Sequence, residues 1–157
     1  MKRRWFLSCA ALLILVMAAC SAVHAPNNTQ SLQLYFLSTD ENGPAIVGQS
    51  SPDVEATPES LLQALLAGPE NDKLRSPFPQ GLSLRGSKLN EGRLIVDFSE
   101  QYGGLTEVSL TLADYCVVLT LCQLEEVTSV EITVSGRPLP YRSHQTLTPD
   151  DAILATQ

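Results

Sequence analysis

Side chains that commonly carry out catalysis or bind metals are scarce in this sequence. It has two histidines, His24 and His144, and neither lies in a segment predicted to be a helix or a strand. A zinc site needs three or four nitrogen or sulfur ligands. The sequence also lacks a G-x-S-x-G motif and a glycine-rich loop of the kind that holds phosphate. We therefore expect no catalytic residues, no metal site and no cofactor.

Positive charge is also scarce. The chain has 10 Lys and Arg residues against 17 Asp and Glu residues. Three of these cations, Lys2, Arg3 and Arg4, lie at the very N-terminus, so the rest of the chain keeps seven and has a net charge near −10. An acidic surface repels phosphate backbones and offers no basic patch to anionic lipids. Nucleic acid is therefore not expected as a partner.

Cysteine is too rare and too unfavourably spaced for a disulfide framework. Of the 4 cysteines, Cys9 and Cys20 lie near the N-terminus. The other two, Cys116 and Cys122, share a predicted helix, whose rise separates their Cα atoms by about 9 Å. Because a disulfide tolerates at most about 7 Å, we expect two buried thiols that act as small apolar groups. A redox pair is the alternative.

The N-terminus has the pattern of a secretory signal peptide. The three cations are followed by an apolar run from Trp5 to Ala19, which is broken only by Ser8. This run is shorter than the roughly 20 residues of a membrane-spanning helix, and small residues follow it. We expect residues 1–19 to be cleaved.

Cys20 directly follows Ala18 and Ala19, and this segment resembles a bacterial lipobox. The resemblance implies that Cys20 becomes the lipidated first residue of the mature chain. Two or more acyl chains on this residue would hold the protein stably on a membrane. The expected location is the cell membrane, lipid-anchored on the extracytoplasmic face. Residues 20–31 are small and polar and would form a flexible tether. A plain signal peptide with an incidental Cys20 is the alternative.

The remaining chain alternates between strand and helix patterns. Alternating apolar residues predict strands, and apolar residues at helical spacing predict helices. A Thr57 cap, Pro58 and a stop at Gly68 mark the first helix. The predicted elements are strand 32–37, helix 57–67, hairpin strands 82–89 and 93–98, helix 107–124 and strand 130–135. This order predicts an α+β fold: a single βαββαβ sandwich with a mixed or antiparallel sheet and two helices on one face.

Three features outside this pattern have more than one interpretation. Residues 141–157 are mostly polar and form a C-terminal tail, in which Thr148 could start a helical turn or the whole segment could be mobile. Tyr102 and Tyr141 are candidates for a binding surface, since aromatic residues often anchor interfaces; partial burial at the edge of the core is the alternative. Asp97 is expected to face solvent or a neighbouring strand and to form no catalytic dyad with Ser99.

Several segments, in this order and spacing, resemble the GerM-type sporulation and germination domain, often called GerMN. The similarity covers residues 32–140. One departure is Gly48-Gln49-Ser50, where relatives often have an arginine. The segments that carry the resemblance are Leu34–Leu37, Leu61–Pro69, Pro79–Gly81, Val96–Ser99, Leu119–Leu121 and Val130–Gly136.

The resemblance implies a non-enzymatic envelope lipoprotein with an interaction or assembly domain. Its role would lie in sporulation, germination or assembly of the cell envelope. The expected partners are the membrane, through Cys20, and a protein or cell-wall component; a second copy of the chain is another candidate. A solute-binding lipoprotein is the alternative, and a small envelope hydrolase or thiol enzyme is a remote one.

Overall fold

The computed structural model describes residues 31–40, 45–140, 142 and 144–154. The chain divides into two units, residues 1–30 and 31–157, and all described residues belong to the second. The predicted leader, Cys20 and most of the tether therefore lie outside the described residues. Within the described part of the chain, no helix has the length and apolarity needed to cross a bilayer.

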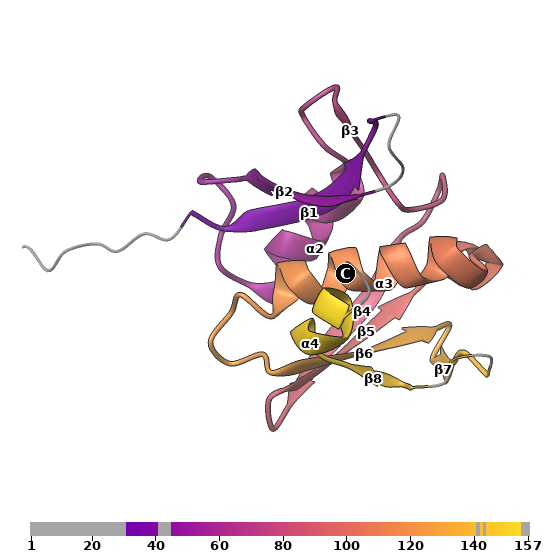
Figure 1. Ribbon diagram of the computed structural model, residues 1–157. Helices are drawn as coiled ribbons and strands as arrows, with labels where there is room; N and C mark the ends of the chain where they lie inside the picture. The colour runs from indigo at the N-terminus through magenta and orange to yellow at the C-terminus, as the bar shows by residue number, and fades with distance from the viewer. Residues whose placement is uncertain (1–30, 41–44, 141, 143, 155–157) are drawn as a thin grey trace, which may run out of the picture. The chain divides into compact units, whose positions relative to one another are not determined.

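Three antiparallel strands form the first sheet, in the order β2-β1-β3 (Figure 1). Strand β1 spans Gln33–Ser38, β2 spans Ile46–Ser50 and β3 spans Leu74–Arg75. Leu34 and Phe36 of β1 are buried, as their spacing of two predicts for one face of a strand. The predicted first strand is therefore present, and two short strands accompany it.

Helix α2, Pro58–Ala67, begins and ends at the predicted signals. Thr57 Oγ1 accepts a hydrogen bond from the Ser60 amide at 3.3 Å, which satisfies one of the unpaired amides of the first turn. The helix ends at Gly68, whose φ of 93° is readily adopted only by glycine.

The second sheet has the order β4-β5-β6-β7, and β8 also pairs with β6. A two-residue turn joins β4 to β5, with φ of 49° at Glu91 and 83° at Gly92, which is the geometry that a tight hairpin requires. A Cβ atom on Gly92 would also approach Thr128 Oγ1 to 2.8 Å. The strands are β4 (Leu84–Asn90), β5 (Arg93–Phe98), β6 (Ser129–Val134), β7 (Arg137–Pro138) and β8 (Thr146–Leu147).

Helix α3, Glu107–Leu121, makes the crossover between the parallel strands β5 and β6, after the short 3₁₀ turn η1 (Glu100–Gly104). Its buried residues include Val117 and Val118. Both residues are β-branched, which slightly disfavours a helix, but the burial of their side chains in the core outweighs this preference. Figure 1 shows α2 and α3 between the two sheets, so α3 contacts protein on opposite sides. This explains why α3 is apolar around most of its circumference.

The mixture of helices and strands confirms the predicted α+β class, and the second sheet is mixed, with β4 antiparallel and β6 parallel to β5. The strands form two sheets instead of the predicted single sheet, however, and the helices lie between the sheets instead of on one face. Side chains of α3 and of the residues after it bond the first half of the β1 edge that faces away from β2, and β3 pairs with that edge only at Leu37 and Ser38. The Gln33 amide donates to Gln123 Oε1 at 2.9 Å, and Gln123 Nε2 donates to the Gln33 carbonyl at 2.7 Å. The Tyr35 amide donates to Thr120 Oγ1 at 3.1 Å. These bonds take the place of a neighbouring strand, so β1 stays separate from the second sheet.

The C-terminal segment contains regular structure, in keeping with a helical turn. Strand β8 is followed by helix α4, Pro149–Leu154. The Thr148 amide donates to Asp151 Oδ2 at 2.7 Å, which caps this helix. Leu147 and Ala152 are buried, so the segment contributes to the core of the unit.

Asp97 links three elements of the second sheet. Its Oδ1 accepts hydrogen bonds from Thr133 Oγ1 at 2.9 Å and from the Gly136 amide at 2.7 Å. Its Oδ2 accepts one from Arg85 Nε at 3.0 Å. Burial raises the pKa of Asp97, but these hydrogen bonds and the Arg85 charge outweigh it, and the net shift lowers the pKa.

We predict that Asp97→Asn lowers the free energy of unfolding at pH 7 by about 1–2 kcal/mol, because the substitution weakens charge-assisted hydrogen bonds. The folded pKa lies below the ordinary 3.8. The carboxylate therefore stabilises the fold above that pH, and its contribution disappears as the pH falls through the folded value. Urea unfolding at pH 7 and at pH 3 checks this, with the exposed Asp72→Asn as the control. An equal difference between Asp97→Asn and the native chain at both pH values would contradict the prediction.

Candidate functional site

A cleft with a volume of about 550 Å³ lies between the N-terminal half of α3 and the C-terminal segment. Thr106 and Glu107 stand at the start of α3, and Asp151 belongs to α4. His144 also lines the cleft and is exposed. The volume falls in the usual range for ligand sites, so the polar groups of this cleft decide what it can do.

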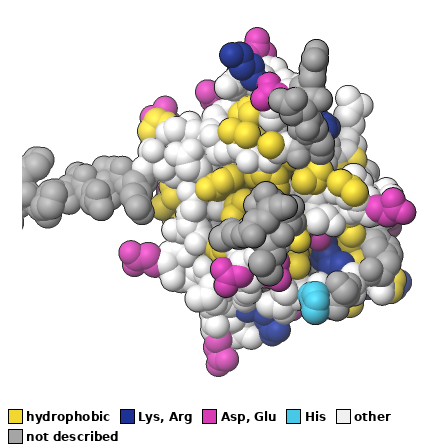
Figure 2. Space-filling model, viewed as in Figure 1, with side chains coloured by type: hydrophobic (Ala, Val, Ile, Leu, Met, Phe, Trp, Pro, Cys, Tyr) yellow, Lys and Arg dark blue, Asp and Glu magenta, His cyan; other side chains and the backbone are white. Residues whose placement is uncertain are grey.

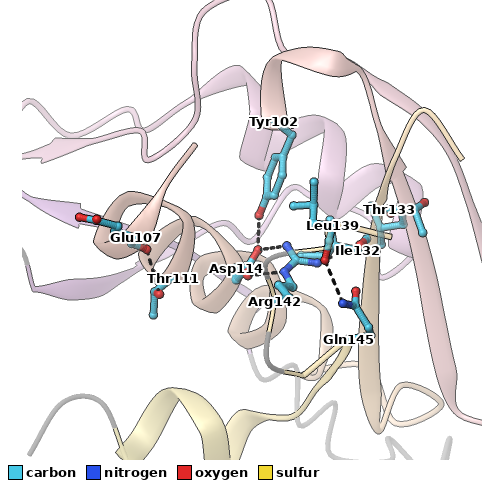
Figure 3. Close-up of polar contacts among 10 residues, drawn as sticks. Tyr102, Glu107, Thr111, Asp114, Ile132, Thr133, Leu139, Arg142 and Gln145 are labelled. Atoms are coloured by element: carbon cyan, nitrogen blue, oxygen red, sulfur yellow. Dashed lines mark hydrogen bonds and ion pairs between the residues drawn. The ribbon is translucent and has the colours of Figure 1, made fainter. Parts of the chain in front are cut away.

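A buried ion pair forms one wall of this cleft (Figure 3). Arg142 Nη2 lies 2.5 Å from Asp114 Oδ1, and Arg142 Nε donates to Asp114 Oδ2 at 3.0 Å. The side chains are only 4% and 7% exposed, respectively. Tyr102 Oη donates to Asp114 Oδ1 at 2.6 Å, and Arg142 Nη1 donates to the Ile132 carbonyl at 2.8 Å. The cluster thus joins η1, α3, β6 and the segment that leads to β8.

Several effects on the pKa of Asp114 oppose one another. Burial raises this pKa, whereas the Arg142 charge and the hydrogen bonds from Tyr102 and Arg142 lower it, and the net shift is upward. Burial and the neighbouring Asp114 charge raise the pKa of Tyr102 well above its ordinary value. Both carboxylate oxygens already accept hydrogen bonds from the protein, so Asp114 is poorly placed to act as a general base. The geometry fits a clamp that holds the C-terminal segment against α3.

The predicted binding residue Tyr102 does not lie on a surface. It is fully buried, and its ring stacks on Phe98 with centroids 4.8 Å apart. Turn η1 directly follows β5 and folds the tyrosine back into the core. Tyr141 and Cys20, the other predicted site residues, lie outside the described residues.

The roles of Asp114 and Arg142 were not predicted from the sequence. Asp114 is the sole acid within the apolar stretch that follows Glu107 in α3. An acid at a core-facing position of such a helix predicts a buried partner, because an unpaired buried charge is very unfavourable. That partner is 28 residues away in the chain, and nothing in the local pattern identifies it.

The other candidate groups are held in structural roles. Both thiols are free, and burial raises the pKa of Cys116 to about 12 and that of Cys122 to about 11, so both stay protonated near neutral pH. Ser99 Oγ accepts from the Ser83 amide at 3.0 Å, whereas Asp97 bonds other residues. Among the residues that the structure describes, no group of three or more His, Cys, Asp or Glu side chains is placed to hold a metal ion.

We predict that Asp114→Asn lowers the free energy of unfolding by about 3–5 kcal/mol, because it leaves the buried Arg142 guanidinium without its counter-charge. The matched control is Glu131→Gln, which breaks the partly exposed pair with Arg93 at 3.6 Å and should cost less than about 1 kcal/mol. Thermal or urea unfolding measures both. Equal effects of the two substitutions would show that the Asp114 pair is not the clamp described here.

Known proteins show the same fold. Residues 33–140 match the Germane family model, which is described as sporulation and spore germination. No curated protein matches the chain.

Three solved structures are similar at low sequence identity. The tandem GerMN domains of the sporulation protein GerM from Bacillus subtilis match with a TM-score of 0.63 and 18% identity, over 77% of this chain and 46% of that one. The chain thus spans about half the length of that tandem structure. The first GerMN domain of the same protein matches with a TM-score of 0.59 and 18% identity, over 76% of this chain and 99% of that domain.

A Clostridium perfringens protein described as a candidate lipoprotein matches with a TM-score of 0.51 and 22% identity, over 77% of this chain and 88% of that chain. At these identities the structures show a shared fold. The family model covers more than half of the sequence. The chain therefore belongs to the Germane family of sporulation and spore germination domains.

Proposed function

We propose that this chain is an envelope lipoprotein that is anchored through Cys20 on the extracytoplasmic face of the membrane. Its Germane domain would bind a protein or cell-wall partner during sporulation, germination or assembly of the cell envelope. It would act through surface contact and carry out no reaction of its own.

Two observations support the anchor. The leader ends in small residues directly before Cys20, and this arrangement resembles a lipobox. The Clostridium perfringens structure with a similar fold is described as a candidate lipoprotein. Since the mature chain is acidic, acyl chains would supply the membrane affinity.

The observation that carries the interaction proposal is the free edge of β2. In the described part of the chain, β2 is the outermost strand of its sheet and pairs only with β1. Exposed strand edges bind partner segments through backbone hydrogen bonds. Figure 2 shows apolar side chains gathered over the middle of one face, with acidic side chains around it. A surface of this kind is suited to selective contact with another macromolecule.

The cleft beside α3 has a volume suited to a small solute, and this volume is its one property that favours the solute-binding alternative. Its buried charged groups, Asp114 and Arg142, bond each other and their neighbours. A ligand would have to displace these bonds to use them, at the cost of leaving buried charges unpaired. The free strand edge therefore supports an interaction module better than the cleft supports solute binding.

We predict that Cys20→Ser moves the protein from the membrane fraction to the soluble extracytoplasmic fraction. Each buried CH₂ of an acyl chain contributes roughly 0.8 kcal/mol to membrane affinity, and the variant loses all of them. Fractionation, combined with intact mass analysis of the N-terminus, measures the change. Cys9→Ser in the leader is the matched control and should remain on the membrane. An unmodified thiol on the native mature N-terminus would rule out the anchor.

We expect the domain to form a covalent complex with a partner when photo-crosslinking residues are placed at its exposed apolar positions in intact cells. Among the described residues, the large apolar side chains that are exposed are Val47, Leu89 and Val108, at 40%, 41% and 65%. The measurement is gel shift followed by mass spectrometry, and the control is the same residue at buried Val117. A strictly monomeric protein at all three exposed positions would contradict the interaction function.

A further inference from the structure

The strand edges of this unit differ in how they are protected. On the side of β1 that faces away from β2, Gln123 and Thr120 bond the backbones of Gln33 and Tyr35. Strand β4, which forms one edge of the second sheet, has a register shift between Leu84 and Gly86. It also presents exposed cations at Arg85 and Lys88. Bulges and charged side chains of this kind discourage pairing with another chain.

Strand β2 has none of these protections. Its sequence, Ile-Val-Gly-Gln-Ser, contains no charge and no proline. Its neighbours Ala45 and Ser51 continue the ladder with β1, through bonds of 2.7 Å from Ser38 and 2.8 Å to Leu32. Because ladder bonds alternate along an antiparallel pair, the backbone groups of Ile46, Gly48 and Ser50 face outward. They form a template for one more strand.

A second cleft, of about 360 Å³, lies between the end of β2 and the end of α2. Its apolar lining includes Leu34, Val54 and Ala64, and its lining also contains the exposed acids Asp53 and Glu70. The Gln49 side chain fixes the wall formed by the loop after α2. Its Oε1 accepts from the amides of Glu70 at 3.1 Å and Asn71 at 3.2 Å. The cleft thus combines an apolar lining with two carboxylates beside a free strand edge.

We propose that β2 binds an extended segment of a partner protein as an added strand, and that a lysine or arginine of that segment enters the 360 Å³ cleft. The long apolar stem of such a side chain suits the lining, while its charged end would reach Asp53 and Glu70. This inference rests on the proposed interaction function and names the chemistry of its partner.

Charge decides between the occupants of this edge. Exposed acids flank both ends of β2, with Asp40 before it and Asp53 and Glu55 after it. The described cations beside this sheet, Lys73 and Arg75, lie just before and on β3, which β1 separates from β2. A second copy of the chain would bring two such acidic margins together. A basic extended segment is attracted to them instead.

The test uses the full chain, purified from membranes in detergent, and two fluorescent peptides. Both are short alternating Val-Thr sequences, with lysine at the centre and both ends in one and glutamate at the same places in the other. Fluorescence anisotropy should show the lysine peptide binding roughly tenfold more tightly, and this preference should shrink at high salt. Equal binding of the two peptides would overturn the proposed partner chemistry.

Two sets of variants locate the site. Val47→Lys places a cation on the β2 edge and should weaken binding of the lysine peptide roughly tenfold. Leu89→Lys makes the same change on the β4 edge at nearly the same exposure, 41% against 40%, and should leave binding unchanged. Asp53→Asn with Glu70→Gln should weaken the lysine peptide roughly 3- to 10-fold and leave the glutamate peptide no weaker. Equal losses from Val47→Lys and Leu89→Lys would overturn the assignment to β2.

Further outcomes separate this inference from the function on which it rests. A dimer that Val47→Lys converts to monomer, without peptide binding, would show that a second copy occupies the edge, and the inference would be wrong. Photo-crosslinks at Leu89 or Val108 without peptide binding at β2 would overturn the inference and leave the interaction function in place. Absence of both crosslinks and peptide binding would overturn both.

Discussion

Helix α3 must satisfy polar groups on several sides while it lies buried between two sheets. A helix in this position can carry a polar side chain only where a partner meets it, because an unpaired buried group is unfavourable by several kcal/mol. Asp114 meets Tyr102 and Arg142, and Thr120 meets the Tyr35 amide. These contacts, together with those of Gln123 just beyond the helix, fix the segments around α3.

Each contact positions a different part of the chain. Gln123 and Thr120 bond β1 at Gln33 and Tyr35, on the side that faces away from β2. On that side β3 pairs only with the end of β1, and β2 pairs along the whole opposite side. Asp114 holds η1 through Tyr102 and the C-terminal segment through Arg142. The ion pair has two hydrogen bonds, but most of its attraction offsets the free-energy cost of removing two charges from water. Its main effect is therefore on arrangement: it requires the C-terminal segment to return to α3.

Local signals made part of this fold predictable. Thr57, Pro58 and Gly68 bounded α2, and the two strands of the β4-β5 hairpin were predicted from their sequence patterns. The pattern of β2 is weaker, because Gly48 and Gln49 interrupt the apolar alternation on which a strand prediction depends. The division into two sheets depends on Gln33 and Gln123, which are 90 residues apart, and local patterns carry no information about such a pair. Tyr102 was misplaced for the same reason, since its partner Asp114 lies on the next element.

The free edge of β2 follows from the same arrangement. An α+β unit with two small sheets has more edge strands to protect than one continuous sheet has. Here α3 and Gln123 just beyond it cover part of one edge of β1, and a bulge with exposed cations protects the edge at β4. An uncharged edge left open carries a risk of self-association, which the acidic margins at both ends of β2 reduce by repelling like copies. The same acids attract a basic segment, so one distribution of charge both disfavours self-pairing and selects the partner. Backbone bonds to β2 would supply affinity without regard to sequence, and the adjacent cleft would supply register and specificity.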